Sequence, residues 1–311
     1  MLATHAEREA RARRQGYIAL LAVQLFFGIF PLVGKLAFTE FSARAIVAWR
    51  IGVGALALGL IALAMHGREV WPRRADWPRL VLCSLLGVVL NMVMFLEGLK
   101  RSTAINTALL LPLIPVFTAV VAIVLRQERF DRMRALGMAI AFCGAALLIV
   151  QRGGELESSH LTGNLLVVAN EICYAIYLVI ARPLLSRYPP LVVVTWVFVL
   201  SIWALPWLAQ DGAAWPANAS TTSWSALAYI VIFPTILAYL LNVYALARVS
   251  SSTTAAFIFV QPTITVLGGV FWLHEPLPHF WLIAAALTFI GVWIVAHRRV
   301  AKPVALAMGG D

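Results

Sequence analysis

The sequence predicts an all-α membrane protein with ten transmembrane helices, arranged as two five-helix inverted repeats around a central cavity. Three observations support this fold class. The 311 residues are 62% hydrophobic and only 12% charged, whereas soluble proteins carry about 25% charged residues. The apolar residues form ten runs of roughly twenty, the length that a helix needs to cross a bilayer, and buried strands are much shorter. Finally, the landmarks of the first half return in the second half in one register.

The ten runs follow one another with only short connections, so no soluble domain fits between them. The first run, Tyr17–Phe38, follows a polar and basic tail over residues 1–16. It is too long for the core of a signal peptide and no small-residue cleavage site ends it, so we expect it to be retained as a span. The other nine runs lie at about Ala45–Met65, Leu80–Leu99, Thr103–Leu125, Met133–Val150, Gly163–Leu184, Leu191–Ala209, Trp224–Leu246, Thr253–Leu273 and Phe280–His297.

The distribution of positive charge predicts the orientation of the chain. Cytoplasmic loops of membrane proteins are enriched in Lys and Arg. With a cytoplasmic N-terminus, eighteen of the 24 Lys and Arg residues fall on the cytoplasmic side and four on the outer side. The remaining two, Lys35 and Arg50, lie inside spans, where each is expected to pair or to reach toward the membrane surface. Both termini are therefore expected in the cytoplasm, and the net charge of +10 requires no nucleic-acid partner.

The repeat is visible at a shift of 147 residues. Pro115 lies in the fourth run and Glu128 follows that run, thirteen residues after Pro115. Pro262 and Glu275 have the same separation in and after the ninth run. The same shift superposes Trp49 on Trp196, Trp77 on Trp224, Gly144 on Gly291 and Arg101 on Arg248. Two unrelated apolar sequences would not keep tryptophans, prolines and a loop glutamate in one register. We expect repeats at residues 17–152 and 163–299, followed by a cytoplasmic tail at 300–311.

An odd number of spans in each repeat decides their relative orientation. A five-span unit that starts in the cytoplasm ends outside, so its copy crosses the membrane in the opposite sense. Inverted repeats are an architecture of secondary transporters, which hold their substrate near the midplane between the two halves. The sequence therefore predicts alternating access to a site that both halves build. Because both halves belong to one chain, a monomer is sufficient.

The segments LNMVMFLEGLKRSTAINTALLLPLIPVFTAVVAIVLRQER and LNVYALARVSSSTTAAFIFVQPTITVLGGVFWLHEPL resemble the EamA repeat, which the ten-helix members of the drug/metabolite transporter superfamily carry twice. The resemblance covers nearly the whole chain and is greatest to the YddG-type bacterial exporters of aromatic and other neutral amino acids. It implies an exporter of amino acids or similar small metabolites in the bacterial cytoplasmic (inner) membrane. Relatives with this skeleton move different metabolites, so an exporter of hydrophobic cationic drugs is the alternative.

The two prolines of the repeated motif are candidate hinges. Proline within a span removes a backbone hydrogen bond and kinks the helix, and the freed carbonyl needs a neighbour or cavity water. Pro115 and Pro262 are therefore expected to face a shared interior, either as hinges or as fixed packing features. Glu128 and Glu275 follow their helices, where a negative charge opposes the helix dipole. Each is expected to need a cationic or backbone N–H partner, as a clamp between loops.

Glu171 is the leading candidate for substrate recognition. A carboxyl group inside a span is costly and usually faces the bundle interior or water. Tyr174 and Tyr177 follow at intervals of three, which places all three side chains on one arc of the helix. We expect Glu171 to bind a substrate ammonium group or to cycle a proton, with the tyrosines as aromatic contacts; a hydrogen-bonded helix contact is the alternative.

Other polar side chains at membrane depth complete the predicted cavity, and a small zwitterion is a suitable solute for them. Each of these groups has the alternative role of joining helices by hydrogen bonds. They are Gln24, the repeat counterpart of Glu171, together with Asn91, Tyr239, Asn242 and Gln261.

Competing function classes lack the residues that they need. An enzyme would require a nucleophile with a base or a metal cluster, but no HExxH or GxSxG motif occurs and all six histidines fall near loops or termini. A channel would require a continuous polar pore, and too few polar residues are expected to face inward to form one. The three cysteines lie inside apolar runs without the spacing of a disulfide framework or metal site. The sequence thus predicts neither an enzyme nor any cofactor or metal.

Overall fold

The computed structural model describes residues 5–126, 131–150, 159–210, 215–216, 218–246, 248, 257–258, 260–277 and 280–297, and all regular structure within them is helical. The main helices of the first half are α1 (His5–Ala37), α2 (Ala43–His66), α3 (Trp77–Ser84), α4 (Asn91–Arg101), α5 (Ala104–Leu110), α6 (Ile114–Val124) and α7 (Arg132–Val150). Those of the second half are α8 (Ser159–Leu185), α9 (Pro190–Val199), α10 (Leu205–Leu208), α11 (Thr221–Val231), α12 (Ala238–Leu246), α14 (Val260–Phe271) and α15 (Trp281–His297).

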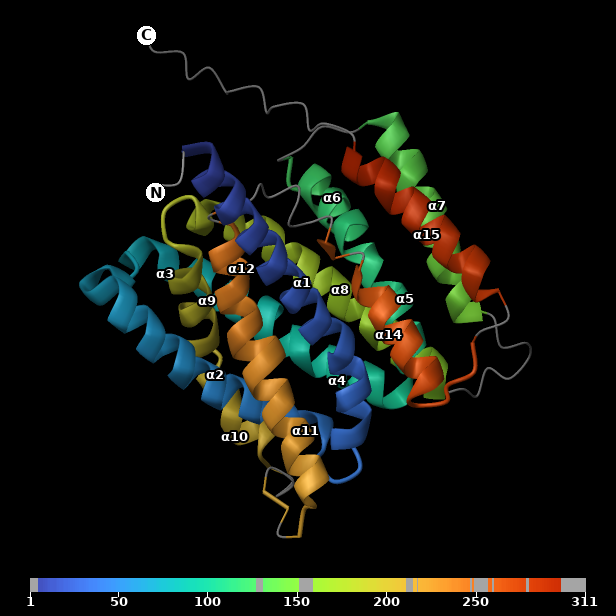
Figure 1. The fold of residues 1–311 in the computed structure, drawn as a ribbon, viewed down its shortest axis with the longest axis horizontal. Coiled ribbons are helices and arrows are strands. Elements are labelled where there is room, and N and C mark those ends of the chain that lie inside the picture. Colours follow the sequence, from blue (N-terminus) through green and yellow to red (C-terminus); the bar gives the residue numbers. More distant parts are fainter. Residues whose placement is uncertain are drawn as a thin grey trace.

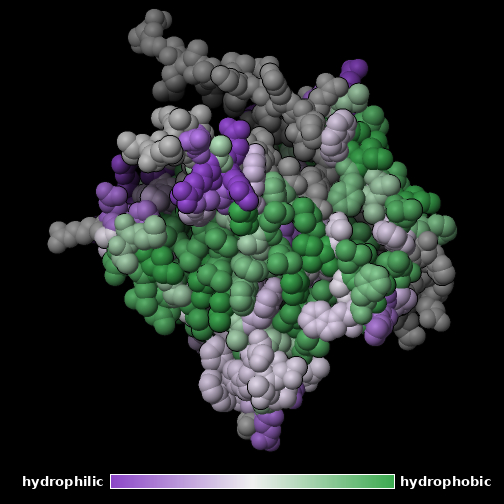
Figure 2. All heavy atoms as spheres, in the orientation of Figure 1, coloured by the Kyte–Doolittle hydropathy of each residue, from purple (hydrophilic) through white to green (hydrophobic). Residues whose placement is uncertain are grey.

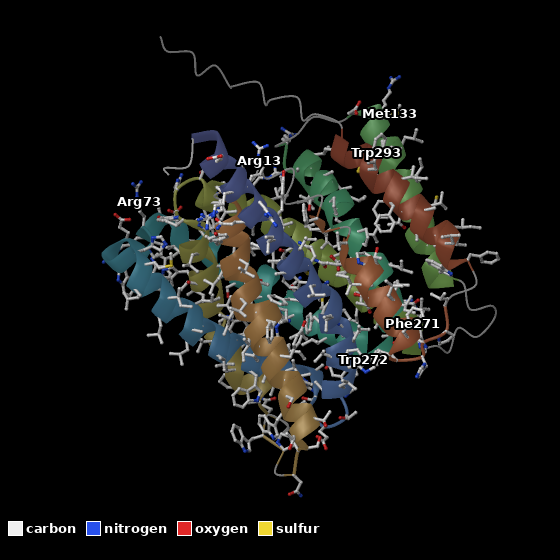
Figure 3. The ribbon with its side chains drawn as sticks, viewed as in Figure 1. Arg13, Arg73, Met133, Phe271, Trp272 and Trp293 are labelled. Carbon is white, nitrogen blue, oxygen red and sulfur yellow. The ribbon has the colours of Figure 1, made fainter. Side chains whose placement is uncertain are left out.

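These helices form the ten spans that the sequence predicts. Seven helical segments are long and apolar enough to cross a membrane, and three shorter apolar helices lie within α7, α14 and α15. Figure 2 shows a hydrophobic band across the middle of the molecule, with hydrophilic residues gathered toward the ends. Phe271, Trp272 and Trp293 are exposed and point away from the bundle (Figure 3), as expected of side chains that face lipid.

Four of the predicted spans are not plain α-helices. Short 3₁₀ segments interrupt the fourth span at Leu111–Leu113 and the seventh at Ile202–Ala204. The third span contains a π-helical segment, Leu85–Leu90, and the eighth contains another, Ile232–Leu237. π-helical segments are rare and are often found at functional sites, and 3₁₀ segments inside a helix often mark hinges. The hydropathy of the chain does not distinguish these segments from α-helix, so the sequence analysis does not predict them.

The positions of the π-helical segments show the repeat directly. Their first residues, Leu85 and Ile232, are separated by the same 147 residues that relate the sequence landmarks, and so are their last residues. The separation survives although the second segment contains Pro234 and the first does not. The backbone irregularity is therefore a property of the repeat and not of one local sequence.

Two tryptophan contacts indicate a two-fold relation between the halves. Trp49 and Trp224 meet edge to face, with centroids 5.9 Å apart and an interplanar angle of 86°. Trp77 and Trp196 meet in the same manner, at 4.9 Å and 75°. A shift of 147 converts Trp49 to Trp196 and Trp77 to Trp224, so exchanging the halves turns one contact into the other. Such an exchange is what two-fold symmetry requires.

The two halves run in opposite directions. The end of α4 lies against the start of α8, where Gly98 and Gly163 approach closely. The start of α4 lies further along α8, where Asn91 donates to Asn170. In Figure 1, α1 begins and α15 ends at the upper side of the molecule, whereas α8 begins at the lower right and rises toward the upper left. An antiparallel crossing of this kind is expected for inverted repeats.

Small residues allow α7 and α15 to pack side by side (Figure 1). A Cβ built on Gly137 would lie 2.8 Å from the carbonyl oxygen of Gly291, and one built on Gly144 would lie 2.7 Å from that of Ala284. These two contacts also exchange under the repeat shift. Close backbone approach of this kind strengthens van der Waals packing where lipid offers no hydrophobic driving force.

Glu275 joins the loop after α14 to the start of α5. Its Oε1 accepts from Ala104 N at 2.9 Å and its Oε2 accepts from Ile105 N at 3.0 Å. The predicted backbone partner is therefore present for Glu275, across the two halves of the chain. Glu128 lies outside the described residues. At the same end of the bundle, Lys35 donates to the carbonyl oxygen of Ser102.

Candidate functional site

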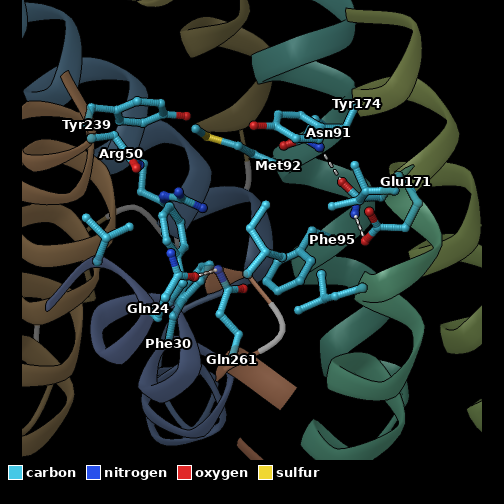
Figure 4. A pocket seen from close by; sticks show the side chains of 17 residues that line it. Gln24, Phe30, Arg50, Asn91, Met92, Phe95, Glu171, Tyr174, Tyr239 and Gln261 are labelled. Atoms are coloured by element: carbon cyan, nitrogen blue, oxygen red, sulfur yellow. Dashed lines mark hydrogen bonds between the residues drawn. The ribbon is translucent and has the colours of Figure 1, made fainter. Parts of the chain in front are cut away.

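A cavity of about 200 Å³ lies between the two halves of the chain. The first half lines it with side chains from α1, α2, α4 and the turn into α6, and the second half does so from α8, α12, α14 and Ile258. Seven of the eight predicted cavity residues line it, namely Gln24, Asn91, Glu171, Tyr174, Tyr239, Asn242 and Gln261. Figure 4 shows this pocket from close by.

Tyr177, the eighth predicted residue, is not among the lining residues. Its ring packs against Gly87 in the first π-helical segment, where an added Cβ would lie 2.6 Å from the ring. It also contacts Tyr174, with ring centroids 5.6 Å apart. The helical arc predicted from residue spacing is wider than the strip of α8 that faces the cavity. Tyr177 therefore lies outside the described wall and packs against Tyr174.

The two prolines lie beside the cavity and not in its wall. Pro115 is in the first turn of α6, directly after the 3₁₀ segment that interrupts the fourth span. Pro262 is buried in the first turn of α14, so it starts this helix and does not kink its interior. The residues preceding each proline, Ile114 and Gln261, both line the cavity. The prolines thus shape the backbone from which cavity side chains project.

Amide side chains form hydrogen bonds across two helix pairs at the cavity wall. Gln261 Nε2 donates to Gln24 Oε1 at 2.6 Å, which joins α14 to α1. Asn91 Nδ2 donates to Asn170 Oδ1, which joins α4 to α8. Both bonds are drawn in Figure 4. Each amide retains further hydrogen-bonding capacity, so these groups can join helices and also face a solute.

Glu171 is completely buried, and one of its oxygens has a partner. Asn170 Nδ2 donates to Oε1 at 2.9 Å. The other oxygen, Oε2, is buried without a hydrogen-bond partner in the described part of the chain. An unpartnered buried oxygen of a carboxyl group is costly. Oε2 therefore has unused acceptor capacity in a residue that lines the cavity.

Arg50 is the one cation among the described residues that line the cavity, and the sequence prediction for it is wrong. Within the described part of the chain it pairs with no acidic side chain, and it does not reach the membrane surface, because it is 4% exposed and faces the pocket. Its Nε donates to Thr235 Oγ1 at 2.9 Å, and its guanidinium carbon lies 4.7 Å from the ring centroid of Phe30.

Asn170 also lines the cavity, and the sequence analysis did not name it as a cavity residue. Its position next to Glu171, as a polar residue inside a span, could have identified it.

The rest of the wall is apolar. Five aromatic side chains line the cavity, and the rings of Phe30 and Phe95 stack with centroids 5.3 Å apart. The other three are Phe27, Tyr174 and Tyr239. Aliphatic and thioether side chains complete the wall, from Val23, Met92, Leu111, Ile114 and Ile258. An apolar pocket with a few convergent polar groups is the usual form of a small-molecule site.

The described residues contain no group of three or more His, Cys, Asp or Glu side chains that would hold a metal ion. The described lining offers amide hydrogen bonds, one acid, one cation and aromatic surface. This arrangement can bind a small polar or zwitterionic solute with an apolar side chain.

Comparison with known proteins identifies relatives that match most of the length of the chain. The EamA-like transporter family matches residues 14–150 and again residues 161–296. The uncharacterized transporter YyaM of Bacillus subtilis (strain 168) is 27% identical over 282 residues, which cover 89% of this chain and 92% of the relative. A probable terminal-alkyne amino-acid exporter of Streptantibioticus cattleyicolor is 26% identical over 289 residues, covering 91% and 93%. A solved crystal structure shares the fold with a TM-score of 0.59 at 18% identity, over 92% of this chain and 96% of that one.

Proposed function

Because the chain belongs to the EamA-like transporter family, we propose that it is a secondary transporter that exports neutral amino acids, above all aromatic and large aliphatic ones. The observation that carries the proposal is the cavity between the two halves, which combines aromatic walls with a few amides and a buried carboxyl group. The aromatic rings would receive the side chain of the solute, and Glu171 would receive its ammonium group. The similarity to a probable terminal-alkyne amino-acid exporter supports this substrate class.

The proposed mechanism is alternating access. A site built by two halves of opposite direction can be exposed first to one side of the membrane and then to the other when the halves rock. The π-helical segments are suitable places for such movement because each directly precedes a stretch of cavity residues, Asn91 in one half and Tyr239 in the other. One chain contains both halves, so a monomer would suffice.

The proposed location is the cytoplasmic membrane of a bacterium, with both termini in the cytoplasm. Arg13 and Arg73, which belong to predicted cytoplasmic segments, and Met133, at the predicted cytoplasmic end of the fifth span, all lie toward the upper end of the molecule in Figure 3. Phe271 and Trp272, next to a predicted outer loop, lie toward the opposite end. The excess of Lys and Arg in the segments that end on the upper side supports its assignment to the cytoplasm.

A counterflow screen in proteoliposomes tests the proposal. Liposomes with purified protein are loaded with one unlabelled amino acid, and entry of the labelled form is measured with and without an imposed pH gradient. We expect saturable counterflow of aromatic and large aliphatic amino acids and little of acidic or basic ones. Ion flux at channel rates, or transport of hydrophobic cations with no amino-acid counterflow, would contradict the proposal.

A further inference from the structure

The cavity holds a buried cation, Arg50, that forms no ion pair with the wall residues that the structure describes. Arg50 is on α2, and within the described residues its Nε donates to the Thr235 hydroxyl while its guanidinium lies over the Phe30 ring. A guanidinium has five N–H donors, and Thr235 accepts from Nε alone. The donors on the two terminal nitrogens have no acceptor in the described part of the chain. In Figure 4 the end of the Arg50 side chain lies at the edge of the pocket.

The local structure holds Arg50 in this position. Thr235 belongs to the second π-helical segment, and its Oγ1 donates to the carbonyl oxygen of Ile230 at 2.9 Å. The hydroxyl proton is therefore used within the segment, so the oxygen can only accept from Arg50. Thr235 is fully buried, as a positioning residue must be if it is to fix an orientation. The Phe30 ring supports the guanidinium by a cation–π contact.

Glu171 lies across the cavity from this cation. Arg50 and Glu171 occupy opposite sides of the pocket in Figure 4, with Met92 and Phe95 between them. No ion pair joins them in the described structure, and each retains unused hydrogen-bonding atoms. Among the lining residues that the structure describes, they are the one cation and the one acid. The wall thus presents a guanidinium and a carboxyl group, with an apolar, aromatic surface between them.

We infer that Arg50 binds the carboxylate of the transported solute while Glu171 binds its ammonium group, so the substrates are zwitterionic α-amino acids. This inference rests on the proposed function and adds the residue that recognises the carboxylate. A guanidinium fork matches a carboxylate with two parallel hydrogen bonds. A charge buried at membrane depth is costly unless it is paired, and the carboxylate of a zwitterion supplies the partner that Arg50 lacks.

The same arrangement separates substrates from similar molecules. An amine or a hydrophobic cation without a carboxylate can reach Glu171, but it leaves Arg50 unpaired and adds a second positive charge to the site. A carboxylic acid without an amine leaves Glu171 unpaired. At a pH below the pKa of its amine, an amino-acid amide keeps the ammonium group and the side chain and lacks only the negative charge of the carboxylate. It is therefore the analogue that isolates the role of Arg50.

The test measures binding of L-phenylalanine and L-phenylalaninamide to purified full-length protein in lipid nanodiscs by calorimetry. The wild-type protein should prefer phenylalanine. Arg50→Gln keeps hydrogen-bond donors but removes the charge, and it should reduce the preference by about thirtyfold or more, in line with the loss of a buried charged partner. Arg79→Gln is the matched control, since Arg79 is exposed at the start of the third span, and it should keep the wild-type ratio.

The ratio of two affinities is measured within one preparation, so the amount of folded protein cancels. Thr235→Val provides a second variant that leaves the charge in place and removes its acceptor; it should lower the preference by less than Arg50→Gln does. An unchanged preference in Arg50→Gln would overturn the assignment of Arg50 and leave the proposed function intact. A wild-type protein that binds and transports no amino acid would overturn both.

Discussion

Replacement of Glu275 tests whether the contact between the α14–α15 loop and α5 stabilises the fold. The first four N–H groups of a helix lack partners within the helix. In α5, the N-cap residue Thr103 supplies its side chain to Asn106 N, and its carbonyl oxygen accepts the first helical bond, from Thr107 N. Glu275 supplies both carboxylate oxygens to Ala104 N and Ile105 N. Three donors without a partner inside the helix are thereby satisfied, at a helix start where Ala104 and Ile105 are fully buried.

The expected loss follows from this accounting. A buried donor without an acceptor costs about 1–3 kcal/mol, so Glu275→Ala, which orphans two donors, should lower the free energy of unfolding by about 2–6 kcal/mol. Glu275 is itself only partly buried, so in the alanine variant water can reach the two freed N–H groups. We therefore expect a loss of unfolding free energy toward the lower end of this range. Glu275→Gln keeps one side-chain oxygen as acceptor and should lose about half as much.

The assay is unfolding in mixed micelles of increasing SDS fraction, followed by tryptophan fluorescence. Glu69→Ala is the matched control, because Glu69 is exposed and lies in a 3₁₀ turn after α2; it should unfold like the wild-type protein. The reasoning is refuted if Glu275→Ala unfolds within about 0.5 kcal/mol of the control, since surface substitutions have effects of that size.

Three further predictions concern packing, substrate recognition and orientation. Gly291→Ala should destabilise the protein in the same micelle assay because the new Cβ would lie 2.4 Å from the Gly137 carbonyl oxygen, whereas Gly59→Ala, with nothing within 4 Å, should not; equal effects would contradict the tight crossing of α7 and α15. Glu171→Gln should abolish or sharply reduce counterflow of phenylalanine in proteoliposomes, because it removes the charge but keeps an acceptor for Asn170, and wild-type rates would exclude Glu171 from recognition. Epitope tags at the two ends of the chain should both be hidden from antibody in intact cells and become accessible once the cytoplasmic membrane is permeabilised. A tag that antibody reaches in intact cells would refute the predicted orientation.

The ten spans and the repeat could be predicted because each follows from one-dimensional features of the chain. Run length determines whether a helix can span the membrane, and one unshifted register relates Pro115 to Pro262 and Trp49 to Trp196. The structure confirms the ten helical segments and shows the same register in its two π-helical segments. Those segments were not predictable, since an i→i+5 pattern depends on packing that hydropathy does not encode.

The candidate site was predictable where depth alone identifies a residue, and not where side-chain direction matters. Polar groups such as Gln24 and Gln261 lie too deep to face lipid, so they had to face each other or a cavity, and they do both. Arg50 is different, because a long cationic side chain inside a span can reach the surface, pair or turn inward. Only the position of Thr235, 185 residues further along the chain, determines that it turns inward.

Accessibility of a single cysteine in the cavity wall tests the central claim most directly. Cys83, Cys143 and Cys173 are replaced by alanine, and Leu111, which lines the cavity from the turn before α6, is replaced by cysteine. A membrane-impermeant thiol reagent is then applied to right-side-out and to inside-out vesicles. We predict labelling from each side of the membrane, slowed by phenylalanine in both cases. Labelling from one side alone, or rates that no amino acid changes, would contradict a substrate cavity that opens alternately to the two sides.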